Sequence, residues 1–120
     1  MKFAEVRRYA MGLGAVTKEP HHHFSSFRVR GRIFVTVPPQ QEHIHLFPGE
    51  SAREQALAMY PEIAQKLLWG GKVVGLRVTL AAATPAVVKS MVLAAWQHKA
   101  GARTGAAAKR RPAAAATKPR

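Results

Sequence analysis

The last twenty residues limit which part of this chain is able to fold. Residues 101–120 hold eight alanines, two prolines and no aliphatic side chain larger than alanine. A segment that buries so little apolar surface does not recover the entropy lost on ordering, so we expect it to be disordered. The other 100 residues are enough for one domain. We therefore predict a folded domain over residues 1–100 and a disordered basic tail over residues 101–120.

Positive charge dominates both parts of the chain. Nineteen Lys and Arg residues outnumber six acidic residues, which gives a formal net charge of +13. The tail contains six of the basic residues and no acid, among them Lys109, Arg110 and Arg111, and this leaves a net charge of +7 on residues 1–100. Basic tails of this composition often act as electrostatic arms on nucleic acid. The alternative is an extension that only improves solubility.

The residue types that are missing exclude several kinds of catalysis. The chain has no Cys, so disulfides, zinc–thiolate sites and thiol nucleophiles are excluded. All six acidic residues are Glu, which excludes an Asp-based triad, a pair of catalytic Asp residues and an EF-hand loop. Neither a glycine-rich phosphate loop nor a G-x-S-x-G motif is present. We predict that the protein is not an enzyme and has no catalytic residue, no cofactor and no small-molecule substrate.

No segment of the sequence suits a membrane. A membrane-spanning helix needs about 20 consecutive apolar residues, whereas the longest uncharged stretch, residues 78–88, is short and contains Pro85. Glu5, Arg7 and Arg8 interrupt the apolar run that an export signal requires. We expect a cytoplasmic protein with no membrane partner, and association with the nucleoid would fit its charge.

The first half of the domain is expected to form a helix over residues 2–11 and then a hairpin over residues 25–37. Gly31 lies at the centre of the hairpin, and a three-residue loop over residues 30–32 pairs Phe27 with Val35. A two-residue loop would put Val35 on the face of the basic side chains, so we favour the longer loop. The chosen register places three side chains on the outer face: Arg28, Phe34 and Thr36.

The second half is expected to alternate between strands and helices. Residues 43–47 read as a strand, and Ser51 with Glu54 forms a capping box for the next helix. Residues 62–68 are predicted to form a short helix, and residues 72–80 a strand. The final helix begins at Pro85 and has a core-facing stripe of Val88, Met91, Val92, Ala95 and Trp96. This order predicts an α+β fold, with one antiparallel sheet of about four to five strands packed on helices.

Three segments resemble the YjbR/MmcQ family of small bacterial proteins. They are VRRYA (6–10), KEPHHHFSSFRVRGRIFVTVPP (18–39) and LLWGGKVVGLRVTL (67–80). The resemblance covers residues 3–98 and implies a CyaY-like (frataxin-like) fold, a single domain, a DNA-binding role and no catalytic residue. The sequence departs from the family at residues 74–76, where a second aromatic residue is often found. The acidic iron-binding ridge of frataxins is not matched, because the first helix has Glu5 alone beside Arg7 and Arg8.

Basic and aromatic side chains are expected to share the outer face of the sheet. No acidic residue is among them; the members are Arg28, Arg30, Arg32, Phe34, His43, His45, Phe47 and Arg77. Cations bind phosphates, unpaired bases stack on exposed aromatic rings, and an Arg at a ribbon tip can read guanine in the major groove. We predict a nucleic-acid interface, with DNA as the favoured partner. The alternative is a merely solvated face, with Phe34 and Phe47 covered; Trp69 and Trp96 are expected in the core.

Histidines support a second hypothesis. Five of the six lie at positions 21, 22, 23, 43 and 45. On strands, His21 with His23 and His43 with His45 would share a face, and such pairs can chelate zinc. Only Glu19 or Glu42 lies near enough in sequence to complete a ligand set. The alternative function is therefore a metal-binding or protein-interaction module that uses the His-rich strands.

Overall fold

The computed structural model describes residues 1–101, which form an α+β domain with one antiparallel six-stranded sheet and three helices. The predicted fold class is confirmed, although the sheet has more strands than expected. Along the chain the elements are α1 (Phe3–Met11), β1 (Val16–His21), β2 (Phe24–Val29), β3 (Arg32–Val37), β4 (His43–Leu46), α2 (Glu50–Met59), β5 (Ala64–Trp69), β6 (Lys72–Thr79) and α3 (Pro85–Gly101).

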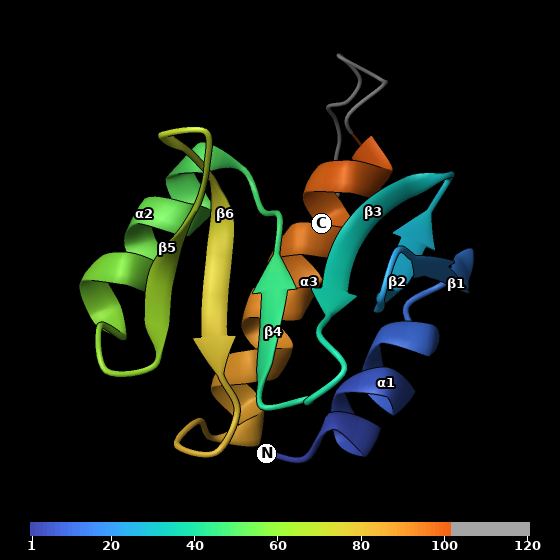
Figure 1. Cartoon of the computed structure of the whole chain (residues 1–120), viewed down its shortest axis with the longest axis horizontal. Coiled ribbons are helices and arrows are strands. Elements are labelled where there is room, and N and C mark those ends of the chain that lie inside the picture. The colour runs from blue at the N-terminus through green and yellow to red at the C-terminus, as the bar shows by residue number, and fades with distance from the viewer. Residues whose placement is uncertain (102–120) are drawn as a thin grey trace, which may run out of the picture.

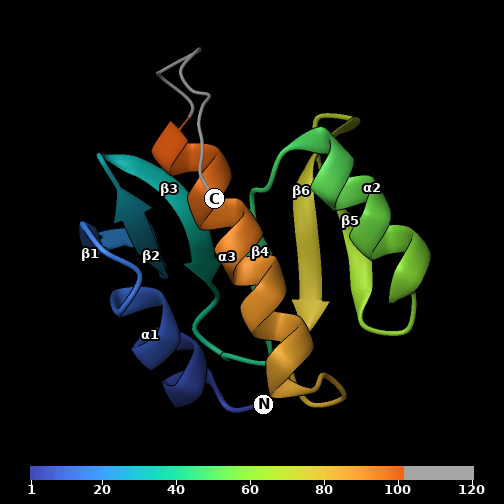
Figure 2. The same cartoon turned by 180° about the vertical axis from the view of Figure 1, so that it is seen from behind.

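The helices lie together on one side of the sheet. The strand order is β1-β2-β3-β4-β6-β5, and every neighbouring pair is antiparallel. In Figure 1 the sheet faces the viewer with the helices behind it, and Figure 2 shows α3 crossing the sheet between α1 and α2. No helix of residues 1–101 covers the opposite face, which we call the open face. None of the described helices is long and apolar enough to cross a membrane.

The core lies between the sheet and α3. The predicted stripe of α3 is confirmed, since Val88, Met91, Val92 and Ala95 are all buried. Trp96 is only partly buried, and its Nε1 donates a hydrogen bond to the carbonyl oxygen of Gly14 at 3.1 Å. The long helix is therefore held by the apolar face that its 3.6-residue periodicity indicated.

The β2–β3 turn differs from the prediction. It has two residues, Arg30 and Gly31, and Val29 lies opposite Arg32. Both turn residues have positive φ angles, 54° and 79°, as in the type I′ turns that fit the twist of two-residue hairpins. The three-residue loop was therefore wrong.

A β-bulge restores the expected pairing farther along the same hairpin. Ile33 lies opposite Arg28, whereas Val35 lies opposite Phe27 as predicted, so Phe34 is the extra residue on β3. Phe34 is fully buried in the hydrophobic core. The prediction that Phe34 lies on the outer face was wrong, because the bulge reverses the alternation at this position.

Two other local predictions were wrong, and one strand had not been predicted. Residues 62–68 do not form a helix, since most of them belong to β5, which pairs with β6 through the turn at Gly70 and Gly71. Strand β1 was not expected. Helix α2 begins at Glu50 after the N-cap residue Gly49, so Ser51 is not its cap. The tail residues 102–120, including Lys109, Arg110 and Arg111, lie outside the described residues.

Candidate nucleic-acid interface

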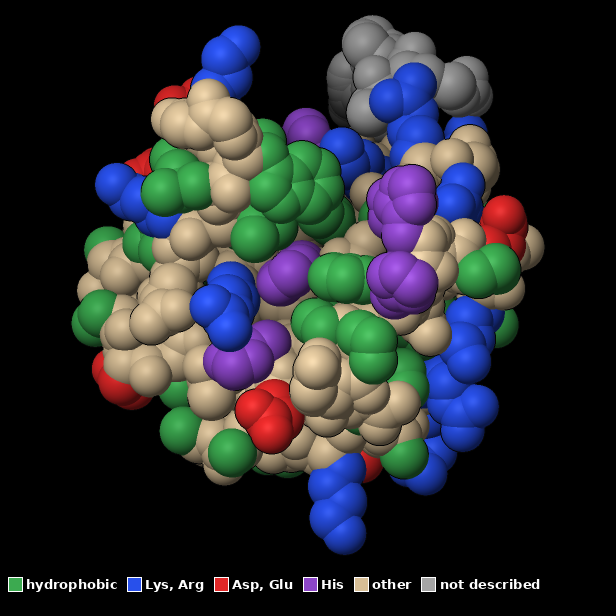
Figure 3. Space-filling view, in the orientation of Figure 1, with side chains coloured by type: hydrophobic (Ala, Val, Ile, Leu, Met, Phe, Trp, Pro, Cys, Tyr) green, Lys and Arg blue, Asp and Glu red, His purple; other side chains and the backbone are tan. Residues whose placement is uncertain are grey.

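A row of polar side chains crosses the open face from one edge of the sheet to the other. Residues that lie directly opposite each other in antiparallel strands point to the same face. The register therefore aligns one residue from each strand; in sheet order they are Glu19, Ser26, Thr36, His45, Arg77 and Gln65. Figure 3 views this face and shows histidine, basic and hydrophobic side chains distributed over the sheet.

Strand β1 brings an acidic residue to this face, which we had expected to be free of acids. The Nε of Arg28 is 3.8 Å from Oε1 of Glu19 and donates a hydrogen bond to Oγ of Ser26 at 3.2 Å. Ser26 Oγ in turn donates to the carbonyl oxygen of Glu19 at 2.8 Å. Arg28 is on the predicted face, but it is half-buried and partly neutralised by Glu19. Its phosphate-binding capacity is correspondingly reduced.

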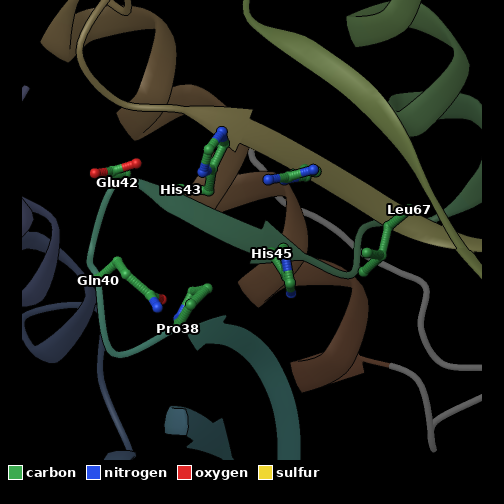
Figure 4. A pocket seen from close by; sticks show the side chains of 7 residues that line it. Pro38, Gln40, Glu42, His43, His45 and Leu67 are labelled. Carbon is green, nitrogen blue, oxygen red and sulfur yellow. The ribbon is translucent and has the colours of Figure 1, made fainter.

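His43, His45 and Arg77 lie together around a shallow hollow of about 380 Å³ on the open face. Glu42 and Leu67 also line the hollow, and Figure 4 shows His43 beside Glu42, with His45 farther along β4. Arg77 is exposed and makes no ion pair with any residue from 1 to 101. The structure thus assembles three of the predicted binding residues, with one carboxylate at the rim.

His45 has the most constrained environment in this hollow. Burial is the main cause that lowers the pKa of His45 below its ordinary value, and the nearby Arg77 and His43 lower it further. Its Nδ1 atom is buried and finds no hydrogen-bond partner among the described residues. The neutral imidazole is favoured at neutral pH, so His45 contributes little positive charge to the face.

The histidine clusters do not match the zinc geometry that we considered. The β1–β2 turn consists of His22 and His23, since His21 lies opposite Phe24, and so His21 and His23 do not share a strand face. His43 and His45 do share a face, as expected. Within residues 1–101 there is no group of three or more His, Cys, Asp or Glu side chains that could hold a metal ion.

Exposed cations also gather at one end of the domain, away from this hollow. Arg30 and Arg32 are exposed at the β2–β3 turn. The pKa of His98 in the last turn of α3 is lowered by burial first, and then by the positive charges of Lys99 and Arg32. Figure 1 shows the β2–β3 turn and the C-terminal end of α3 at the same end of the domain. We call Arg30, Arg32 and Lys99, with the turn and helix end that carry them, the cationic end.

The basic tail is attached to the cationic end. Helix α3 ends at Gly101, and the six Lys and Arg residues of 102–120 follow it directly in the chain. Arg30 and Arg32 make no ion pair within the part of the chain that the structure describes. The tail therefore begins at the end of the domain where the exposed arginines of the β2–β3 turn lie.

An aromatic pair formed by the partly buried Phe47 and the exposed Trp69 also lies on the open face; the sequence analysis placed Phe47 on this face but missed Trp69. Trp69 is 55% exposed, so the expectation that it belongs to the core was wrong. Its ring centroid is 5.8 Å from that of Phe47, with the two planes tilted by 52°. The pair Gly70-Gly71, which directly follows Trp69, is a typical two-residue hairpin signal and would have indicated an exposed position for this indole.

A comparison with protein-family models and with curated proteins found no match. The resemblance to YjbR/MmcQ proteins therefore remains a prediction from the three segments quoted above.

Proposed function

We propose that the protein binds nucleic acid, with DNA as the favoured partner, through the cationic end and the basic tail. The observation that carries the proposal is that the β2–β3 turn, with Arg30 and Arg32, lies at the same end of the domain as the end of α3, after which the six cations of the tail follow in the chain. Phosphate contacts supply most of the affinity in such complexes, and they require cations that are not already paired with carboxylates. Arg30 and Arg32 satisfy this requirement within residues 1–101.

The open face has a secondary part in the proposal. Phe34 is removed from the contact set because it is buried, and Arg28 is weakened by Glu19. Arg77 keeps an exposed guanidinium, and the neighbouring His43 and His45 offer hydrogen bonds to phosphate oxygens.

The tail is expected to add affinity without sequence preference. Lys109, Arg110 and Arg111 form its densest run of charge, and closely spaced cations attract the phosphate backbone whatever the bases are. The resemblance to YjbR/MmcQ proteins supports the same proposal, because it implies a DNA-binding role and a CyaY-like fold. Such a role in turn implies a cytoplasmic, nucleoid-associated protein.

A salt series on the full chain tests the proposal. On duplex DNA the slope of log K against log[salt] is about −0.9 for each phosphate that a cation neutralises. The double variant R30N/R32Q should bind more weakly, with a slope that is shallower by up to about 2. The tail variant K109Q/R110Q/R111Q should have a slope that is shallower by up to about 3.

A variant with the same loss of charge elsewhere provides the control. Arg7 and Arg8 are exposed on α1, so R7Q/R8Q removes two charges without changing the cationic end. This variant should keep the parent slope. If R7Q/R8Q and R30N/R32Q weaken binding equally, the affinity follows net charge alone and the proposed interface is wrong. If the parent shows no salt-dependent binding to any nucleic acid, the proposed function is wrong.

A further inference from the structure

Trp69 is exposed although it is the largest apolar side chain on its strand. It is the last residue of β5, lies opposite Lys72, and is 55% exposed to solvent. A contiguous exposed apolar patch on a domain surface commonly marks a binding site. An indole at the end of a hairpin presents a flat ring, held by the backbone ladder of the two strands, at low entropic cost.

The residues beneath this indole give it a firm support. Phe47, whose ring meets Trp69, is anchored by a hydrogen bond from its backbone N–H to the carbonyl oxygen of Phe34 at 3.2 Å. The ring of Phe47 also lies against Gly75, where an added Cβ would be only 3.0 Å from its Cδ1. Because residue 75 has no side chain, the ring of Phe47 can occupy the space beside it. Trp69 in turn packs against the ring of Phe47. We call Phe47 and Trp69 the aromatic platform.

The aromatic platform is connected to the cationic end. Two residues after Phe47, Gly49 lies against the imidazole of His98, whose Nδ1 would be 3.2 Å from a Cβ at Gly49. His98 is in turn close enough to Arg32 and Lys99 to respond to their charges. On the other side, Lys72 lies opposite Trp69. Figure 3 shows a hydrophobic patch in the upper part of the open face with basic side chains on both sides of it.

We propose that the aromatic platform is a stacking site for unpaired nucleobases, so that the preferred partner is single-stranded nucleic acid. The inference rests on the proposed function, since the cationic end must hold the backbone while a base stacks on Trp69. In a duplex the base faces are already stacked on each other, and the ring of Trp69 gains little from it. An unpaired base has a free face, and each stacked base is worth between about 5-fold and about 150-fold in affinity.

Two variants of neighbouring residues test the stacking site. Trp69→Ser removes the indole without changing the charge. Leu68→Ser is the matched control, because Leu68 is also 55% exposed and belongs to the same strand but has no aromatic ring. Fluorescence anisotropy of a labelled oligo(dT) strand and of a matching duplex measures binding by the full chain. Urea unfolding of both variants checks that each retains the fold.

The loss of affinity should be confined to the single-stranded partner and to the variant that lacks the indole ring. W69S should lose at least about 5-fold in affinity for the single strand, with little change on the duplex and with the parent salt slope on both. L68S should bind both partners as the parent does. The inference is overturned if W69S binds the single strand like the parent, or if it loses affinity for the two partners equally. Failure of the parent to bind either partner would overturn the proposed function as well.

A spectroscopic measurement gives an independent result. Trp69 and Trp96 are the two tryptophans of the chain, so Trp96→Phe leaves Trp69 as the sole indole fluorophore. Stacking of a base on this indole should quench its fluorescence, and the quenching should saturate at the same oligo(dT) concentration as the anisotropy. Binding by anisotropy without quenching would place the strand elsewhere on the protein and overturn the stacking site.

Discussion

His45 on β4 lies directly opposite Arg77 on β6, in the middle of the polar row that crosses the open face. The pKa of His45 is lowered by burial first, and then by the charges of Arg77 and His43. Its buried Nδ1 has no hydrogen-bond partner among the described residues. Protonation of His45 would add an N–H group at a site where Nδ1 has no acceptor. It would also place a positive charge near the guanidinium of Arg77. The folded state therefore favours the neutral imidazole.

This relationship predicts that the protein loses stability in mildly acidic solution. In the unfolded chain His45 takes up a proton near its ordinary pKa of 6.5, whereas in the folded state it does so only at lower pH. As the pH falls below 6.5 the unfolded state binds more protons, and the free energy of unfolding decreases until the pH falls below the folded-state pKa. Urea unfolding between about pH 7.5 and about pH 5 should show this decrease.

His45→Gln isolates the contribution of this imidazole. The variant cannot titrate, so its free energy of unfolding should depend less steeply on pH than that of the parent. His23→Gln is the control, because His23 is exposed in the β1–β2 turn. It should keep the parent pH dependence. Equal pH dependence in the parent and in H45Q would show that His45 is not held neutral by the fold.

The burial of Phe34 predicts a large effect on stability at a position that the sequence placed on the surface. Phe34→Ala should decrease the free energy of unfolding by about 3–5 kcal/mol, because it leaves a cavity in the core. Trp69→Ala should cost roughly 1 kcal/mol or less, since Trp69 is 55% exposed. Urea denaturation measures both. Similar losses for the two variants would contradict the bulged register of β3.

Periodicity predicted the parts of the fold in which one period holds over a whole element. The stripe of α3 repeats at helical spacing over residues 88–95, and its members are buried as expected. The pair Phe27 and Val35 also agrees with the prediction. The turn between them does not, because strict alternation favoured a three-residue loop. The actual chain combines a two-residue turn with a bulge, and this solution keeps the same core pair.

Long-range strand pairing accounts for most of what the sequence did not predict. Residues 64–69 form β5 because they pair along β6, although their pattern also fits a short helix. Glu19 reaches the open face because β1 pairs with β2, and a segment containing Pro20 and a run of histidines gave little indication of a strand. The candidate site changed accordingly: Arg28 gained an acidic neighbour, and Trp69 moved from the core to the surface.

Gly75 is predicted to tolerate no side chain. A Cβ at this position would clash with the backbone carbonyl oxygen of Leu46 on the adjacent strand, and it would also crowd the ring of Phe47. Gly75→Ala should therefore lower the free energy of unfolding by about 1–3 kcal/mol, because β4 and β6 must separate to admit the methyl group. Gly12→Ala is the control, since its Cβ would meet only ordinary contacts at 3.5 Å. A neutral G75A variant would contradict the close approach of the two strands.

The arginine at position 30 is predicted to lower the stability of the fold through its backbone conformation and to raise the affinity for DNA through its charge. Its φ of 54° lies in the left-handed region, which disfavours arginine and suits asparagine at the first position of a type I′ turn. Arg30→Asn should raise the free energy of unfolding by roughly 1 kcal/mol and at the same time weaken binding to DNA, with a salt slope that is shallower by about 0.9. Urea denaturation and the salt series measure the two effects on the same preparation. Because stability should rise while DNA affinity falls, a damaged fold cannot produce the same result. A less stable R30N variant would contradict the turn geometry. An unchanged salt slope would show that Arg30 is not part of the interface.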